Sequence, residues 1–410
     1  QGAAIYVNGA SNVLLDNLTI GQNSNGDTQA VRYGVRVSDT SGSTGPVAIV
    51  GGQITSAMIT NNAALDGDST VPNGVTPVLD GAGVLLEDSA SNVQIVGTQI
   101  GSQTAGNLVG VVSRSSNTSA AVNSIGVNPI GDFTTEARLN SRELVIPATD
   151  SSGAAINIRD AYVGLTIRAS VDFIDGNGAA TPNAEIVAVD PVTRKITLNL
   201  PLAGSDTEAS ITPNPNNSSN RTQIGQNFWG VLLESGSTRI VNTDITNNVY
   251  DGIFIGDGAA NAVFALIGES DEADATSNAI FLNGRNGIRF ASNLTSSNNG
   301  ITDITIQGNY IGRSSTDTRF VGNGEGSYFW EGNPGLNNTF RSFGYDPVTN
   351  TPTPPAYITG DDLFRALITP EISGGDVDEN GNVNADFVAG STGGGTSTPI
   401  GPPPPNGGNS

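Results

Sequence analysis

The chain has 410 residues, and 17 Lys and Arg against 39 Asp and Glu give it a net charge of −22 at pH 7. So acidic a chain is a poor partner for nucleic acid, and no apolar run is long enough for membrane insertion. The absence of Cys and His excludes the usual zinc and iron–sulfur sites, thiol nucleophiles and histidine-based catalysis.

A bent apolar pattern recurs through the first 129 residues. It appears at 12–20 and returns at 47–54 and 92–100, with side chains at offsets 0, 2, 5 and 7, as at Val13, Leu15, Leu18 and Ile20. Offsets 0 and 2 have the period of a strand, the step to 5 indicates a bend, and 5 to 7 is again a strand. Short strands that begin near a glycine, at 33–37, 82–86 and 110–112, accompany these units.

Residues 130–212 interrupt the pattern. Strands are expected at 142–146, 161–167, 185–189 and 195–200, with a turn at 190–194. We predict a small all-β domain inserted into a loop, either as a binding element or as a structural addition.

The pattern resumes in residues 213–345, at 238–245 and 304–311, with Gly-led strands at 230–233, 252–255 and 287–290. The step from Gly230 to Gly252 is 22 residues, the length of one turn of a parallel β-helix. Asparagines at turns and inward bends are expected to stack from coil to coil and to tolerate a left-handed backbone: Asn12, Asn92, Asn247, Asn248, Asn278, Asn283 and Asn309.

The predicted fold is therefore all-β, a right-handed parallel β-helix (solenoid) with a small inserted all-β domain. The main competitor is an antiparallel sandwich, which would use the Asn-Gly turns at 8–9, 73–74 and 283–284. We favour the β-helix because the bent pattern recurs unchanged at distant sites.

The units at 92–100 and 301–311, followed by Gly-Ser-Gln-Thr and Gly-Arg-Ser-Ser-Thr-Asp-Thr, resemble the right-handed parallel β-helix repeats of large bacterial surface and adhesin-like proteins. The resemblance covers residues 1–129 and 213–330. It is specific for the fold and weak for activity, since parallel β-helices also carry pectinolytic enzymes, alginate epimerases and phage tailspikes.

Aromatic residues gather near the end of the second repeat region, at Tyr328, Phe329, Trp330, Phe340, Phe343 and Tyr345. They are expected either to cap the open end of the core or to form a sugar-stacking or docking surface. Residues 346–410 form a C-terminal extension with one expected helix at 361–368 and a Pro- and Gly-rich tail.

Calcium is the expected metal, because only oxygen ligands are available. Asp376, Asp378 and Asn380 match the first half of a calcium loop, with Gly381 at the turn position. Phe387 stands where that loop needs a bidentate Glu, so an ordinary acidic turn is the alternative.

No catalytic residue is assigned. Asn242-Thr243-Asp244 copies a polygalacturonase motif, but that family's Gly-His-Gly motif is missing and the repeat explains the tripeptide. Lyase chemistry would need Arg285 or Arg289 near Asp251 and Asp257, whereas a glycosidase would need only a carboxylate pair.

Two functions follow. The first is an extracellular, non-enzymatic structural or adhesive protein, a subunit or segment of a surface layer, filament or adhesin, that self-associates end to end. The second is a polysaccharide-binding or polysaccharide-cleaving β-helix of the tailspike or lyase kind.

Overall fold

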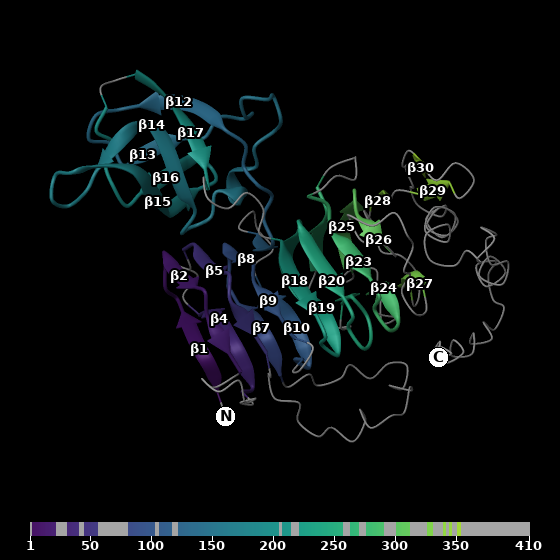
Figure 1. Cartoon of the computed structure of the whole chain (residues 1–410). Coiled ribbons are helices and arrows are strands. Elements are labelled where there is room, and N and C mark those ends of the chain that lie inside the picture. The colour runs from purple at the N-terminus through teal and green to yellow at the C-terminus, as the bar shows by residue number, and fades with distance from the viewer. Residues whose placement is uncertain are drawn as a thin grey trace, which may run out of the picture.

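The computed structural model describes residues 2–21, 31–40, 45–55, 81–102, 106–116, 122–204, 207–214, 221–256, 263–269, 276–290 and 301–311, and the strands at 326–330, 339–341, 344–346 and 351–353. These residues form an all-β structure with parallel strands in curled sheets (Figure 1). Apart from one short 3₁₀ helix, η2 (Ile158–Asp160), they contain no helix. None of them could therefore cross a bilayer as a helix.

Three parallel sheets contain the repeated units. Sheet A consists of β1 (Ala3–Asn8), β4 (Tyr33–Asp39), β7 (Ala82–Asp88), β10 (Val109–Ser115), β19 (Trp229–Ile240), β21 (Ile253–Ile255), β24 (Asn286–Phe290) and β27 (Gly326–Trp330). Sheet B consists of β2 (Val13–Asp16), β5 (Val47–Val50), β8 (Val93–Val96), β11 (Asn123–Ile125), β19 again, β22 (Val263–Ile267), β25 (Ile301–Gln307) and β28 (Thr339–Arg341).

Sheet C consists of β3 (Thr19–Ile20), β6 (Gln53–Ile54), β9 (Gln99–Ile100), β18 (Thr222–Gly225), β20 (Thr243–Thr246), β23 (Ala279–Phe281) and β26 (Tyr310–Ile311). Along the chain the strands alternate in the order A, B, C, and each pairs in parallel with the next strand of its own sheet. This parallel pairing contradicts an antiparallel sandwich for the repeat regions.

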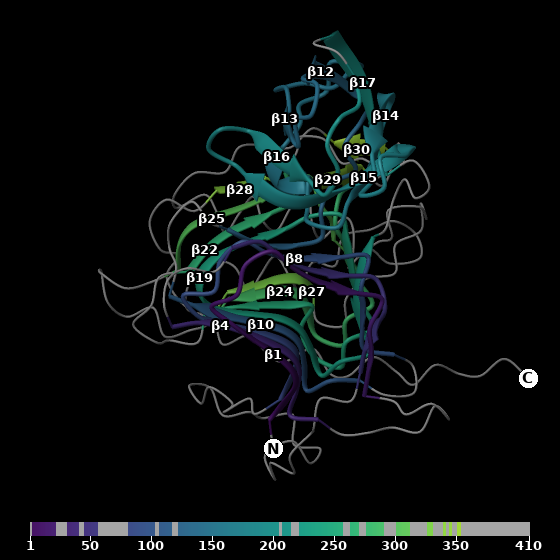
Figure 2. The ribbon, with the colours of Figure 1, turned by 90° about the vertical axis from the view of Figure 1, so that its left-hand side faces the viewer.

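The predicted offsets are the positions that line the common interior. At offset 7, one isoleucine from every strand of sheet C stands in register with the next: Ile20, Ile54, Ile100, Ile224, Ile245, Ile280 and Ile311. None is more than 8% exposed. They join buried residues of sheets A and B in one apolar cluster, around which the sheets curl (Figure 2). This burial is the main stabilising term of the repeat regions.

Buried amides line the interior as well. Asn107, Asn227, Asn248 and Asn283 form a ladder in which each side-chain NH₂ donates to the next side-chain oxygen, at 2.9, 3.2 and 2.9 Å. Each also donates to the carbonyl of a sheet C isoleucine. A shorter ladder joins Asn278 to Asn309 at 2.8 Å.

The prediction of stacked asparagines is therefore confirmed at Asn248, Asn278, Asn283 and Asn309. Asn12, Asn92 and Asn247 instead have positive φ angles of 56°, 55° and 56°. They are turn residues, because an asparagine accepts the left-handed backbone more readily than most side chains.

The inserted domain is a separate six-stranded antiparallel sheet. Its strands are β12 (Phe133–Ala137), β13 (Glu143–Val145), β14 (Thr166–Ile174), β15 (Ala180–Asp190), β16 (Lys195–Leu198) and β17 (Thr207–Pro213). The strand expected at 161–167 begins only at Thr166, since Gly164 has a φ of +89°. A two-stranded antiparallel sheet, β29 (Gly344–Asp346) and β30 (Thr351–Thr353), lies near the C-terminal end of the described residues.

The inserted domain packs against sheet B. Its apolar cluster includes Val96 of β8 and contacts Val50 of β5, and the side-chain amide of Gln94 donates to the carbonyl of Arg159. In Figure 1 it lies beside β2, β5 and β8. This contact places polar residues of η2 over the outer surface of sheet B.

Candidate functional site

Two buried residues of opposite charge meet where the inserted domain contacts sheet B. Arg239 of β19 is only 2% exposed and Asp160 of η2 only 4%. The Arg239 guanidinium donates to both Asp160 oxygens, at 2.7 and 3.2 Å. Such two-point pairing fixes the orientation of both groups.

Glu269, two residues after the end of β22, is the third member of this ionic cluster. One of its oxygens accepts from Arg239 and from the Asn128 amide, the latter at 2.8 Å. The other accepts from the Asn157 amide at 2.6 Å. The cluster therefore joins the inserted domain to two strands of sheet B, and both carboxylates are fully engaged.

Burial disfavours the charged forms of both Asp160 and Arg239, and their partners outweigh it only at Arg239. Burial raises the pKa of Asp160 to about 6, against the opposing effect of Arg239. Burial lowers the pKa of Arg239, but the charges and hydrogen bonds of Asp160 and Glu269 outweigh it and leave that pKa above its ordinary value. Both groups are ionised at pH 7.

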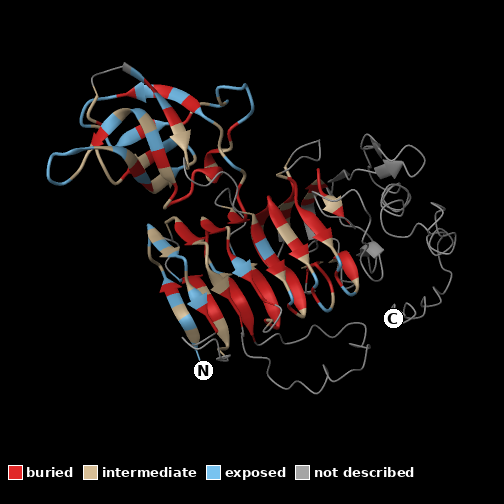
Figure 3. Ribbon diagram, viewed as in Figure 1, coloured by how far each residue is buried: buried red, intermediate tan, exposed pale blue. Residues whose placement is uncertain are grey.

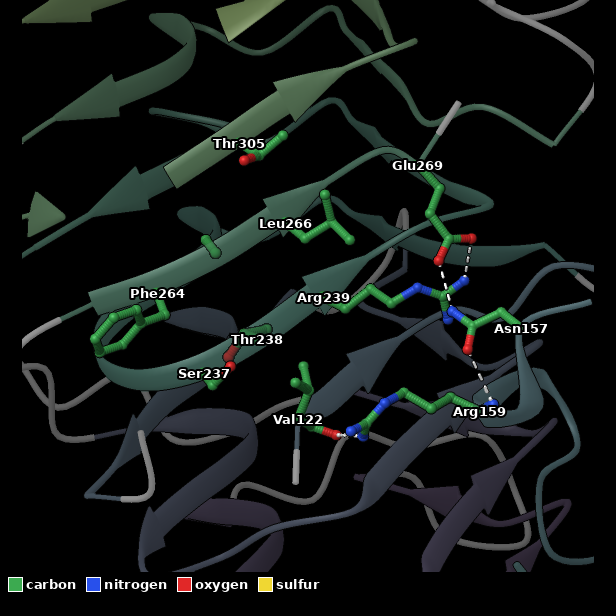
Figure 4. A pocket seen from close by; sticks show the side chains of 11 residues that line it. Val122, Asn157, Arg159, Ser237, Thr238, Arg239, Phe264, Leu266, Glu269 and Thr305 are labelled. Atoms are coloured by element: carbon green, nitrogen blue, oxygen red, sulfur yellow. Dashed lines mark hydrogen bonds and ion pairs between the residues drawn. The ribbon is translucent and has the colours of Figure 1, made fainter. Parts of the chain in front are cut away.

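A pocket of about 330 Å³ opens beside the cluster (Figure 4). Its lining comes from η2 and from the outer positions of sheet B, including Asn157, Arg159, Ser237, Phe264, Glu269 and Thr305. Asp160 does not line it. The one carboxylate on its wall, Glu269, is held by Arg239, Asn128 and Asn157, so the described part of the pocket offers no free acid–base pair.

A second buried carboxylate lies on the side of sheet A. Asp251 is 0% exposed, and one of its oxygens accepts from the main chain and side chain of Asn286 at 3.2 and 3.0 Å. Arg289 lies 3.7 Å from the other oxygen. Burial raises the pKa of Asp251, and the charge of Arg289 opposes that shift.

The two arginines considered for lyase chemistry also face aromatic rings. The guanidinium carbon of Arg285 lies 4.6 Å from the Tyr250 ring centroid, and that of Arg289 lies 5.2 Å from the Phe254 centroid. Such contacts are typical of cation–π packing. Asp257, the other residue of that hypothesis, lies outside the described residues.

The Asn242-Thr243-Asp244 tripeptide has a structural explanation. The buried Thr243 hydroxyl donates to the carbonyl of Val241 at 2.7 Å, and the Asn242 amide donates to that of Val127 at 2.9 Å. Asp244 pairs with Arg221 at 2.6 Å. Each of the three side chains therefore has a structural contact within the fold, in agreement with the interpretation of the motif as part of the repeat.

Four of the six predicted aromatic residues lie on strands that continue the parallel sheets. Tyr328, Phe329 and Trp330 belong to β27, in register with residues 288–290 of β24. Phe340 of β28 stands in register with the buried Ile306. Tyr345 belongs to β29, and Phe343 lies outside the described residues. The cap and the docking surface both stay predictions.

The predicted calcium ligands Asp376, Asp378 and Asn380 lie outside the described residues, as does the expected helix at 361–368. Within the described part of the chain, no three acidic side chains come close enough together to hold a metal ion.

Comparison with known proteins adds no assignment. No protein-family model matches the chain, and no curated protein matches it in sequence. The ionic cluster and the pocket could not be predicted from the sequence, because their residues come from segments that meet only in the folded chain. The one local signal was Arg239, a charge at a strand position where neighbouring strands carry Ser124 and Leu266.

Proposed function

We propose that the protein is an extracellular, non-enzymatic structural or adhesive protein, a subunit or segment of a surface layer, filament or adhesin, whose parallel sheets form a right-handed β-helix. The A, B, C strand order and the in-register stacks of sheet C support the helical path. Abundant glycine and polar turn residues suit such a coil, and a small share of charged residues (14%) with an acidic balance suits a secreted protein.

The proposed self-association rests on β1, β2 and β3, the first strands of the three sheets. Within the described residues, β1, β2 and β3 each pair on one side only, with β4, β5 and β6. Their interior residues Ile5, Val13 and Leu15 are partly exposed, whereas the residues in register on the next strands, Val35, Val47 and Ile49, are at most 1% exposed. Figure 3 shows this change in burial along the row of strands.

Among the described residues, this edge combines backbone groups that have no strand partner with partly exposed apolar side chains, so another strand in the same register would stabilise it. We assign that strand to a second copy of the chain. Head-to-tail contacts between unlike ends propagate into filaments when the rotation does not close a ring.

Electron microscopy of the purified chain, combined with a polysaccharide-cleavage assay, tests the proposal. The structural function predicts end-to-end polymers and no cleavage. Isolated particles that cleave a polysaccharide would contradict it and would favour the tailspike-like or lyase-like alternative.

A further inference from the structure

The pocket beside the ionic cluster contains a cation, Arg159, that is outside the ion pairs of the cluster among the described residues. Arg239 engages Asp160 and Glu269. Arg159, one residue before Asp160, instead directs its guanidinium toward Val122 (Figure 4), where Nη1 donates to the carbonyl oxygen at 3.4 Å. Among the described residues its guanidinium has no other hydrogen-bond partner and no acidic partner.

The surroundings of Arg159 disfavour its charge. Burial lowers the pKa of Arg159, and the nearby charge of Arg239 lowers it further. An arginine stays protonated regardless, so the positive charge persists at an energetic cost. A ligand anion in the pocket would offset that cost and use the planar donors of the guanidinium, which suit a carboxylate.

The other walls of the pocket combine hydroxyl groups with one aromatic ring. Ser237 and Phe264 are cross-strand neighbours on β19 and β22, and Thr305 follows on β25 next to Leu266. A sugar ring presents hydroxyl groups at its rim and C–H groups on its face, and these match the two kinds of surface. A volume of about 330 Å³ is in the range of small-ligand pockets.

We propose that this pocket binds an acidic sugar, with the carboxylate on Arg159, the ring against Phe264 and the ring hydroxyls near Ser237 and Thr305. The site belongs to the junction of the inserted domain with sheet B, and it is independent of the β1–β3 edge. It would allow an assembled protein to hold a uronate-containing polysaccharide.

The size of the pocket and the one cation, Arg159, that its described residues leave outside an ion pair favour a sugar carboxylate over an acidic peptide, which needs a longer groove or several cations. The net charge of −22 repels any anion at long range, so short-range contact must supply the affinity. Binding is therefore best measured near 0.15 M salt, where the screening length is about 8 Å.

Isothermal titration calorimetry with digalacturonate, its methyl ester and diglutamate tests the proposal. Digalacturonate is expected to bind with a Kd of about 1 mM or lower, and the uncharged methyl ester at least about tenfold more weakly. Arg159→Gln should weaken digalacturonate binding by a similar factor, while Arg159→Lys restores part of it. The matched control Arg138→Gln, at an exposed arginine of the same domain that pairs with Glu136, should bind like the wild type.

The proposal is overturned if digalacturonate does not bind at 10-fold the expected Kd, or if the methyl ester or diglutamate binds equally well. Unchanged binding by a folded Arg159→Gln variant would also overturn it. Should that variant fail to fold, the comparison of the acid with its methyl ester on the wild-type chain still decides. Sedimentation of Arg159→Gln should match the wild type, which separates this test from that of self-association.

Discussion

At the scale of single residues, Arg239 joins the inserted domain to the parallel sheets. Its two acidic partners lie 79 residues before it and 30 residues after it in sequence. A local pattern search cannot find a site assembled over such separations. The same limit explains why Arg159 was not predicted, since it stands in a short segment that becomes part of a pocket only by packing on sheet B.

Replacing Arg239 by Met should destabilise the protein by roughly 3–5 kcal/mol, because two carboxylates would lose their buried counter-charge. Urea unfolding followed by circular dichroism measures this. Arg138→Met is the control, since its side chain is 69% exposed, and should cost less than about 1 kcal/mol. Equal losses of unfolding free energy in the two variants would show that the buried cluster adds no stability beyond that of an exposed ion pair.

Asp160 should make stability depend on pH in an unusual direction. Its pKa is raised from 3.8 to about 6 by burial, so between these values the folded chain holds a proton that the unfolded chain has released. Stability from this group is therefore present below pH 4 and lost as the pH rises through 6.

Asp160→Asn removes this dependence. Relative to the variant, the wild type should lose roughly 2 kcal/mol of unfolding free energy between pH 4 and pH 7. Urea titrations of both proteins at the two pH values measure the difference. A wild type that gains stability relative to Asp160→Asn over this range would contradict the pKa shift.

At the scale of elements, the bent repeat was predictable wherever one unit is contiguous in sequence. The units at 12–20, 47–54, 92–100, 238–245 and 304–311 all correspond to paired strands of sheets B and C. Two units were missed, because their strands are not contiguous in sequence: β11 and β18 are separated by the whole inserted domain, and β22 and β23 by residues 268–278. Asn107 and Asn227 of the amide ladder were missed for the same reason, since 120 residues separate them.

Two glycines with similar backbone conformations should respond differently to substitution. Gly101 follows β9 with a φ of +91°, and a Cβ there would lie 1.9 Å from the carbonyl oxygen of Gly225 on the neighbouring strand. Gly178, in the turn between β14 and β15, has a φ of +81° and nothing within 4 Å of that position.

Gly178→Ala should therefore cost only the backbone strain, about 1–2 kcal/mol. Gly101→Ala adds a clash between adjacent strands and should cost about 3 kcal/mol or more. Thermal or urea unfolding compares the two. Equal destabilisation would mean that the strands do not approach as closely as the register of β9 and β18 indicates.

At the scale of the whole molecule, the net charge of −22 raises the question of what allows acidic copies to assemble. Calcium is our proposed answer, held by Asp376, Asp378 and Asn380. Excess EGTA should then lower the melting temperature of the calcium-loaded protein, and Asp376→Asn with Asp378→Asn should abolish that response. An unchanged melting temperature in the chelator would remove calcium from the proposal.

The parallel pairing and the common apolar interior were predictable from composition and periodicity, because they depend on many similar residues. Self-association through the β1–β3 edge depends instead on what lies next to that edge.

Sedimentation velocity over a concentration series tests this self-association most directly, with the wild type, Leu15→Lys at the edge and Val192→Lys at an exposed turn residue of the inserted domain. The proposal predicts that the wild type and Val192→Lys form growing oligomers, whereas Leu15→Lys stays monomeric because it buries a charge at the junction. A wild type that stays monomeric throughout, or a Leu15→Lys variant that assembles equally well, would contradict it.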